Sequence, residues 1–201
     1  VNDMGIHDRM TVEQLVPALD ALQGAALVVL DANLPERTIE WLARTLTVPV
    51  IADAVSAAKA ARLKPALSHL DALKPNGIEA ELLTGIPATG AGSAAKAAQA
   101  LLDRGVRRVF LTMGARGVCC ADAHGTHILP GGHPRVVNAT GAGDAFTAAL
   151  AWARLQNLPL AEAALAGMAA ATIAMESMET VSPEMSPERL ERRMDELRGI
   201  I

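Results

Sequence analysis

The strongest chemical signal in the sequence is a run of small residues that ends in a carboxylate. Asn138-Ala139-Thr140-Gly141-Ala142-Gly143-Asp144 stands where an apolar stretch gives way to a long helical pattern. The small residues Gly141, Ala142 and Gly143 leave backbone N–H groups uncovered at a helix N-terminus, which suits a phosphate or a developing anion. Asp144 falls in the first turn, where it could accept the proton of a hydroxyl that attacks a phosphoryl group. The spacing alone equally allows Asp144 to act only as a helix cap.

Two common phosphate-binding loops do not fit this run. The Walker loop requires Lys and then Ser or Thr after its last glycine, whereas Asp144 follows Gly143 here. The dinucleotide-binding fingerprint requires a third glycine at the position of Phe146. We therefore interpret the run as neither of these loops.

A second group of polar residues, Lys74-Pro75-Asn76-Gly77-Ile78-Glu79, follows a predicted strand. Asn76 and Glu79 are three residues apart and share one face of the first helical turn, where they could hold Mg²⁺ through water or orient phosphates. Asn76 could instead cap the helix while Glu79 completes a capping box, and the pattern taken alone favours this structural interpretation.

A third group follows the strand predicted over residues 108–113. The Thr112 hydroxyl and the amides around Gly114 and Gly117 could receive the phosphates of a nucleotide, because ligands of open α/β sheets gather at the carboxyl ends of strands. The same residues could equally form only the turn into a hairpin.

The elements that must position these groups alternate along the chain. Short apolar runs predict strands over residues 25–31, 48–52, 72–74 and 108–113, and amphipathic stretches predict helices over 35–43, 57–70 and 93–102. This rhythm indicates a parallel sheet covered on both faces, so we predict an α/β fold with three layers.

The second half of the chain ends this alternation. Residues 117–123 and 126–129 predict an edge hairpin. Residues 142–155 are apolar nearly all round and predict a buried helix, residues 160–175 a second helix, and residues 187–197 a charged surface helix. Because no repeat or linker interrupts the pattern, we expect one domain over residues 1–201.

Composition excludes several classes of function. A hydrophobic content of 51% predicts a real core, while 2% aromatic residues provide too few stacking surfaces for single-stranded nucleic acid. A net charge of −4 leaves no basic stripe for a phosphate backbone or an anionic membrane. With no long apolar run and no charged leader, we expect a cytoplasmic protein. Cys119 and Cys120 are adjacent in an apolar stretch and predict reduced core thiols.

Together, these groups resemble the ribokinase-like, PfkB-type carbohydrate kinases. Five positions of that family's D-T-x-G-A-G-D signature are matched by residues 138–144, counting the unrestricted x position at Thr140. Its N-x-x-E element corresponds to Asn76 and Glu79, and its T-x-G element corresponds to Thr112 and Gly114, in the same order. The resemblance runs from about residue 2 to near residue 180.

The resemblance implies a three-layer α/β/α fold with a mainly parallel sheet, of which the chain would be the C-terminal two thirds. The N-terminal substrate and lid region of the family, including its Gly-Gly element, has no counterpart here, and the chain begins at Val1 rather than at a methionine. We therefore expect a fragment whose acceptor pocket and closure are incomplete.

The resemblance also implies a role for each site residue. Asp144 would be the catalytic base, and the amides of Gly141, Ala142 and Gly143 would form the anion hole. ATP phosphates would contact Thr112, Gly114, Gly117 and Thr140, Mg²⁺ would be held through water by Asn76 and Glu79, K⁺ is allowed at Asn138 and Thr140, and the substrate would contact Asn2 and Asp3. Asn138 replaces the Asp that is common in the family, so dependence on K⁺ stays open.

Within the family, residues 1–4, 52–59, 73–81 and 136–144 are most similar to members that act on pseudouridine. The predicted reaction is ATP-dependent phosphorylation of its ribosyl 5'-hydroxyl. The alternatives are another sugar or nucleoside as the acceptor, or a nucleotide-binding domain without turnover. We expect a small-molecule partner, neither nucleic acid nor membrane, and the family allows a homodimer.

Overall fold

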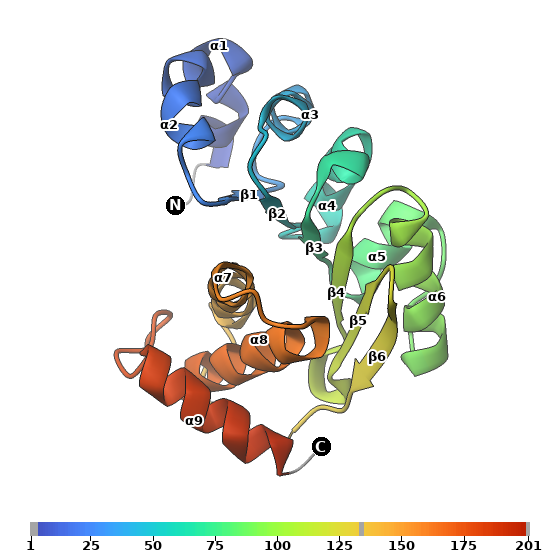
Figure 1. Ribbon diagram of the computed structural model, residues 1–201, viewed down its shortest axis with the longest axis vertical. Coiled ribbons are helices and arrows are strands. Elements are labelled where there is room, and N and C mark those ends of the chain that lie inside the picture. Colours follow the sequence, from blue (N-terminus) through green and yellow to red (C-terminus); the bar gives the residue numbers. More distant parts are fainter. Residues whose placement is uncertain (1–3, 133–134, 200–201) are drawn as a thin grey trace.

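The structure, a computed structural model, describes residues 4–132 and 135–199 (Figure 1). In this part of the chain the strands are β1 (Val28–Asp31), β2 (Val50–Asp53), β3 (Ala72–Lys74), β4 (Arg108–Thr112), β5 (Val118–Asp122) and β6 (Gly125–Leu129). They form one sheet in the order β1-β2-β3-β4-β5-β6. The strands from β1 to β4 are parallel, and β5 and β6 form an antiparallel hairpin at the edge. The predicted mainly parallel sheet and its edge hairpin are confirmed.

Helices connect and cover these strands. The α-helices are α1 (Val12–Leu15), α2 (Leu19–Gln23), α3 (Glu36–Thr45), α4 (Ala57–Ala60), α5 (Gly77–Thr84), α6 (Ala91–Leu102), α7 (Ala142–Leu155), α8 (Leu160–Met175) and α9 (Pro187–Arg198). The 3₁₀ helices are η1 (Met4–Arg9), η2 (Val16–Ala18), η3 (Ala61–His69) and η4 (Gly114–Arg116). No helix within the described residues is long and apolar enough to cross a membrane.

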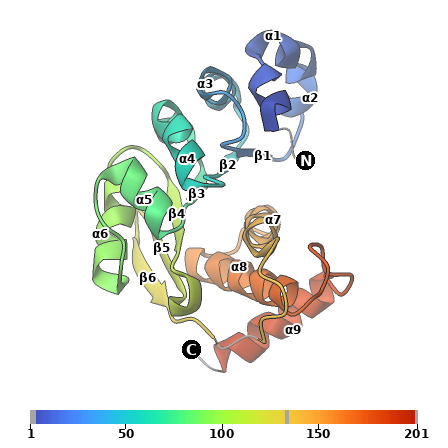
Figure 2. The same cartoon turned by 180° about the vertical axis from the view of Figure 1, so that it is seen from behind.

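The sheet separates two hydrophobic clusters, which gives the three predicted layers. Because side chains alternate along a strand, Ala52 and Leu73 join the cluster under α3 to α6, whereas Ile51, Ala72 and Phe110 join the cluster under α7, α8 and α9. Figures 1 and 2 show the two helical layers on opposite sides of the sheet, with α9 packed outside α8. The α/β/α architecture is therefore confirmed.

Three helices differ from their sequence predictions. The helix expected over residues 57–70 is α4 followed by the 3₁₀ helix η3, because Pro65 lacks an N–H donor and its ring crowds the preceding turn. The buried helix expected over residues 142–155 exposes Asp144 and Ala148. The charged helix α9 is on the surface as expected, but it buries Leu190 and Met194.

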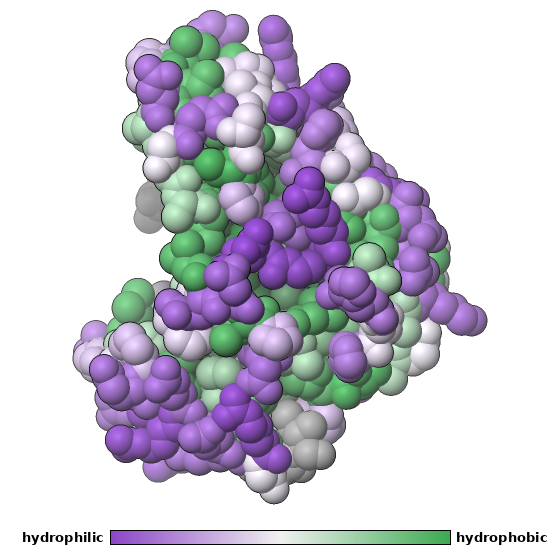
Figure 3. All heavy atoms as spheres, viewed as in Figure 1, coloured by the Kyte–Doolittle hydropathy of each residue, from purple (hydrophilic) through white to green (hydrophobic). Residues whose placement is uncertain are grey.

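The side of the molecule drawn in Figure 3 is hollowed between the N-terminal helices and the layer of α7 to α9. Apolar side chains line both sides of this hollow. On the β1 side, Val29 is exposed although it lies in a strand. The residues that the sequence predicts to carry the chemistry lie at the carboxyl edge of the sheet and at the start of α7.

Candidate active site

The carboxyl ends of β2, β3 and β4 bring the predicted groups to one edge of the sheet. Asp53 and Lys74 are the last residues of β2 and β3, and they are paired in register. One residue beyond Pro75, Asn76 forms an isolated parallel bridge with Thr112 at the end of β4. Parallel strands place their carboxyl ends together, so the second and third groups predicted from the sequence are neighbours.

The loop before α7 is fixed by its backbone. Gly141 is the N-cap of α7 and has a left-handed conformation with φ 84°. A Cβ atom at Gly141 would lie 2.3 Å from the carbonyl oxygen of Thr180. The Asn138 N–H donates to the Met175 carbonyl at 3.1 Å. The start of α7 is therefore held tightly against the segment that follows α8, and only glycine fits at position 141.

The first turn of α7 offers free donors. Within the described ranges, the backbone N–H groups of Gly141, Gly143 and Asp144 donate to no protein acceptor, as is usual at a helix N-terminus. The Ala142 N–H, which was expected in the anion hole, makes a long contact of 3.4 Å to the Ala139 carbonyl. Two of the three predicted amides are thus available to an anion, and the amide of Asp144 adds a third.

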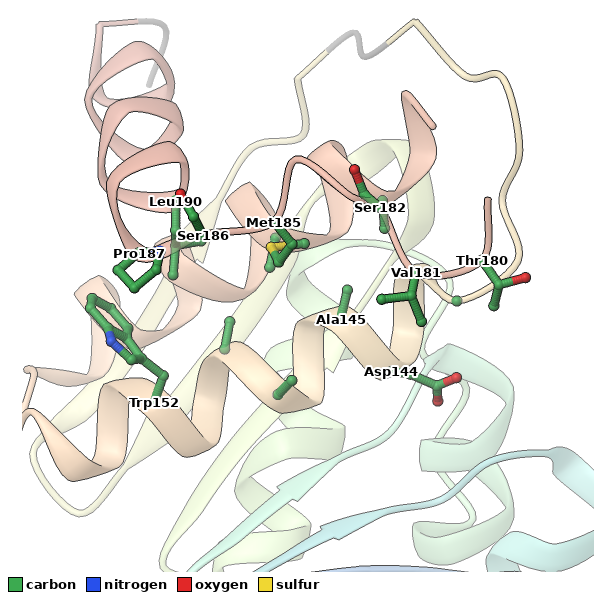
Figure 4. A pocket seen from close by; sticks show the side chains of 15 residues that line it. Asp144, Ala145, Trp152, Thr180, Val181, Ser182, Met185, Ser186, Pro187 and Leu190 are labelled. Carbon is green, nitrogen blue, oxygen red and sulfur yellow. The ribbon is translucent and has the colours of Figure 1, made fainter. Parts of the chain in front are cut away.

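Asp144 does not cap α7. The N-cap of this helix is Gly141, which has no side chain, and the Asp144 carboxylate makes no hydrogen bond or ion pair within residues 4–132 and 135–199. The side chain is exposed. In Figure 4 it projects from the first turn of α7, below Val181 and Thr180, and points away from Trp152. Of the two interpretations of Asp144, the geometry leaves the carboxylate free for chemistry.

Asn76 and Glu79 form the capping box at the start of α5. The Glu79 N–H donates to Asn76 Oδ1 at 3.0 Å, and the Asn76 N–H donates to Glu79 Oε2 at 2.8 Å. Glu79 is buried, and this burial raises the pKa of its carboxyl, although the Asn76 amide and the Lys74 charge act in the opposite direction. The interpretation of Asn76 and Glu79 as a capping box is therefore confirmed. One oxygen of Glu79 is left for a contact through water.

The part of the chain that the structure describes has no cluster of three His, Cys, Asp or Glu side chains able to ligate a metal ion. Asn76 and Glu79 could support Mg²⁺ only through water, as predicted from the sequence. The Mg²⁺ assignment stays a prediction.

The turn after β4 contains two glycines, one with room for a side chain and one without. Gly114 is exposed, and no atom lies within 4 Å of the place where its Cβ would be. Gly117 is buried, and a Cβ there would lie 2.0 Å from the Leu129 carbonyl oxygen. The Thr112 N–H donates to the Pro75 carbonyl at 2.9 Å. Packing therefore explains Gly117, whereas Thr112 and Gly114 remain accessible for contacts with a nucleotide.

The side chain of Asn138 is used in local hydrogen bonds. Its Oδ1 accepts from the Thr140 N–H at 3.0 Å, and its Nδ2 donates to the Met178 carbonyl at 3.4 Å. The side-chain amide of Asn138 therefore joins the loop before α7 to the segment that follows α8. The predicted substrate residues Asn2 and Asp3 lie outside the described residues.

The sequence reasoning missed a buried ionic group under the first turn of α7. Lys74 Nζ lies 3.1 Å from Asp53 Oδ2, and Thr147 Oγ1 donates to the same oxygen at 2.7 Å. The other oxygen, Asp53 Oδ1, accepts from the N–H of Val55, a β-branched residue at φ 63°. A signal was present, because Asp53 and Lys74 each end an otherwise apolar strand.

An apolar cavity of about 400 Å³ lies on the outer side of α7, where it meets α8, α9 and the α8–α9 connection. Figure 4 shows Trp152, Pro187 and Leu190 at one end of this cavity, with Asp144, Thr180 and Val181 at the other. One wall of the cavity is formed by the face of α7 that is left uncovered. Its Ala-rich sequence resembles a core helix, so the sequence did not reveal this cavity.

Comparison with known proteins places this geometry in a family. The sequence profile of pfkB family carbohydrate kinases matches residues 2–187. The pseudouridine kinase of Escherichia coli is 35% identical over 188 residues, which are 92% of this chain and 60% of that protein. The chain therefore spans about 60% of the length of this relative.

Solved structures give the same result. A carbohydrate kinase from Agrobacterium tumefaciens is 30% identical and superposes with a TM-score of 0.81, covering 97% of this chain and 63% of that one. An Arabidopsis thaliana ribokinase complexed with ribose and ATP, 24% identical, shares the fold with a TM-score of 0.75 over 92% of this chain and 59% of its own. By sequence and by fold, the chain belongs to the pfkB family of carbohydrate kinases.

Proposed function

We propose that the chain, acting as one kinase domain over residues 1–201, carries the phosphoryl-transfer centre of an ATP-dependent kinase. The acceptor is a ribosyl 5'-hydroxyl, and pseudouridine is the best candidate. The observation that carries this proposal is the free carboxylate of Asp144 beside the free amides of Gly141 and Gly143. The 35% identity to a pseudouridine kinase over 92% of the chain supports the choice of acceptor.

In this mechanism, the acceptor hydroxyl donates its proton to Asp144 while its oxygen attacks the γ-phosphorus of ATP. The bond between that phosphorus and the bridging β,γ-oxygen breaks, and ADP leaves. The amides of Gly141 and Gly143 stabilise the negative charge that develops on the transferred group, since they are fixed in place before the reaction. Thr112 and Gly114, at the end of β4, would contact the other phosphates.

Mg²⁺, when bound, would neutralise and orient the phosphate oxygens. The proposed support is indirect, through water on Asn76 and the free oxygen of Glu79. For K⁺, the Asn138 amide makes a direct hydrogen bond to Met178, so the two loops are already joined without a cation. A K⁺ requirement, a homodimer and a cytoplasmic location stay predictions.

The incomplete match to the relatives favours a second candidate, a nucleotide-binding domain without turnover. The chain covers 60% of the pseudouridine kinase, and the remaining length could supply acceptor contacts. Calorimetric titration with ATP and a coupled assay of ADP release distinguish the candidates, with pseudouridine, uridine, ribose and fructose as acceptors.

ADP release that depends on pseudouridine, and is fastest with it, supports the proposed function. If ADP release is fastest with ribose or fructose, the proposed acceptor is wrong, but the proposed phosphoryl transfer stands. Binding of ATP without release from any acceptor supports the second candidate. A chain that binds no ATP contradicts both.

A further inference from the structure

A lysine charge lies directly under the proposed phosphate site. Lys74 is buried, and its Nζ atom is 3.4 Å from the place where a Cβ atom of Gly143 would be. Gly143 is the second residue of α7 and has a free amide. Because Gly143 has no side chain, nothing of its own residue separates the ammonium group from the first turn of the helix.

This position is unfavourable for folding alone. The N-terminus of a helix carries a partial positive charge, so acidic groups stabilise it and a cation there is repelled. A buried lysine also loses its hydration, and an ion pair seldom repays that loss fully. The stability of the fold therefore does not explain why a lysine ends β3 at this point.

Asp53 holds the lysine in a defined orientation. The carboxylate receives Lys74 Nζ at 3.1 Å and Thr147 Oγ1 at 2.7 Å on one oxygen, and the Val55 N–H at 2.9 Å on the other. Thr147 is one helical turn beyond Gly143, and its hydroxyl also lies 3.1 Å from the Gly143 carbonyl. The positive end of the pair is thus at the first turn of α7, and the negative end is deeper along the helix.

The ion pair also connects the two groups predicted from the sequence. Lys74 is two residues before Asn76, the N-cap of α5, and its charge acts on the buried Glu79 carboxyl. Its ammonium group reaches the start of α7. One side chain therefore couples the end of β3 to the helix that bears Asp144.

We propose that Lys74 is a positioning residue of the phosphoryl-transfer site, and that Asp53 holds its ammonium group beneath Gly143 as a fixed positive charge. The charge favours the γ-phosphoryl group of ATP at the N-terminus of α7. This inference rests on the proposed function and deepens it, because it assigns the origin of the preference for ATP over ADP. Asp53 is the counter-ion that keeps the ammonium group in place when no phosphate is bound.

Single substitutions of the two partners test this by the sign of their effects. The measurement is the ratio of the Kd values for ADP and a non-hydrolysable ATP analogue, obtained by calorimetry on the whole chain. Lys74→Met should lower the preference for the analogue by about tenfold, the usual size of one charged hydrogen bond. Asp53→Asn should leave that preference unchanged or increase it, because the amide oxygen of Asn can still accept from Lys74 Nζ while the opposing charge is removed.

Two controls separate charge from folding. Asp53→Asn combined with Lys74→Met leaves no unpaired buried charge, so it should fold even if Lys74→Met alone does not. This double variant should still lower the preference for the analogue, by about threefold or more, since it removes the oriented pair. Lys59→Met removes a half-buried lysine of α4 that bonds Asn33, on the other face of the sheet, and should not change the ratio.

Two outcomes for the ratio of Kd values would overturn the inference. If the double variant keeps the ratio of the unchanged chain, or if Lys74→Met and Asp53→Asn lower it equally, the pair is only structural and this inference is overturned. An unchanged chain that binds neither nucleotide overturns the proposed function together with this inference. Normal binding with an unaltered ratio in the double variant overturns the inference alone.

Discussion

In the loop before α7, Gly141 is a position at which a single added methyl group should be strongly destabilising. A residue with a side chain loses about 1 to 2 kcal/mol when it adopts the left-handed conformation that Gly141 has at φ 84°. The added Cβ would also lie 2.3 Å from the Thr180 carbonyl oxygen, so one of the two loops must move by about 0.7 Å to reach 3.0 Å, the shortest contact that Cβ atoms make.

These two contributions set the size of the effect. Overpacking of this kind costs about 1 to 3 kcal/mol. Thr180 and Val181 are exposed, so their segment can move and relieve part of the overlap. We therefore expect Gly141→Ala to lower the free energy of unfolding by about 2 to 4 kcal/mol, which for a chain of this length lowers Tm by roughly 4 to 16 °C.

The assay is urea and thermal unfolding, with Gly92→Ala as the matched control. Gly92 is in the first turns of α6, has no left-handed backbone, and has open space where its Cβ would be. The same substitution there should raise stability, by up to about 1 kcal/mol, because alanine is the better helix former. If Gly141→Ala is as stable as the unchanged chain, the account of the loop before α7 is wrong.

Three further predictions concern buried groups. Thr147→Val keeps the shape of the side chain but removes the 2.7 Å hydrogen bond to Asp53, so the free energy of unfolding in urea should fall by about 2 kcal/mol; a change below about 0.5 kcal/mol would contradict the buried network. Burial raises the pKa of Glu79, so its titration stabilises the fold at acid pH and this contribution is lost as the pH rises through the folded pKa. The stability of the unchanged chain relative to Glu79→Gln should therefore decrease from pH 4 to pH 7, and a rising difference would refute the assignment. Burial also raises the pKa of Cys119 to about 11 and that of Cys120 to about 12, so a thiol reagent at mildly alkaline pH should label neither cysteine before unfolding, and labelling of the native chain would show that they are accessible.

Periodicity and turn residues predicted most of the fold because each signal is local. The hairpin of β5 and β6 and the span of α8 follow from such patterns. The failure at residues 57–70 is also local, since Pro65 converts the expected helix into a 3₁₀ turn. No pattern within 142–155 shows that Ala148 faces an open cavity, because alanine is typical of cores and is also a strong helix former on helix surfaces.

The site was only partly predictable, for a different reason. The run that ends at Asp144 identified the free end of α7, because small residues followed by a carboxylate indicate a helix N-terminus with uncovered amides. The capping box of Asn76 and Glu79 was the alternative interpretation, and only the structure shows that both side chains are engaged in it. The ion pair of Asp53 and Lys74 joins residues from different strands, so sheet register was needed to find it.

The central claim is that Asp144 is the base that accepts the acceptor's proton, and one substitution tests it directly. Asp144→Asn keeps the size of the side chain and removes its basicity, while Asp144 has no structural partner among the described residues to lose. The account predicts that ADP release with the preferred acceptor falls by about 10²- to 10⁴-fold, with the Kd for ATP within about threefold of the unchanged protein. Turnover that stays near its original rate in Asp144→Asn, with ATP bound normally, would contradict the account.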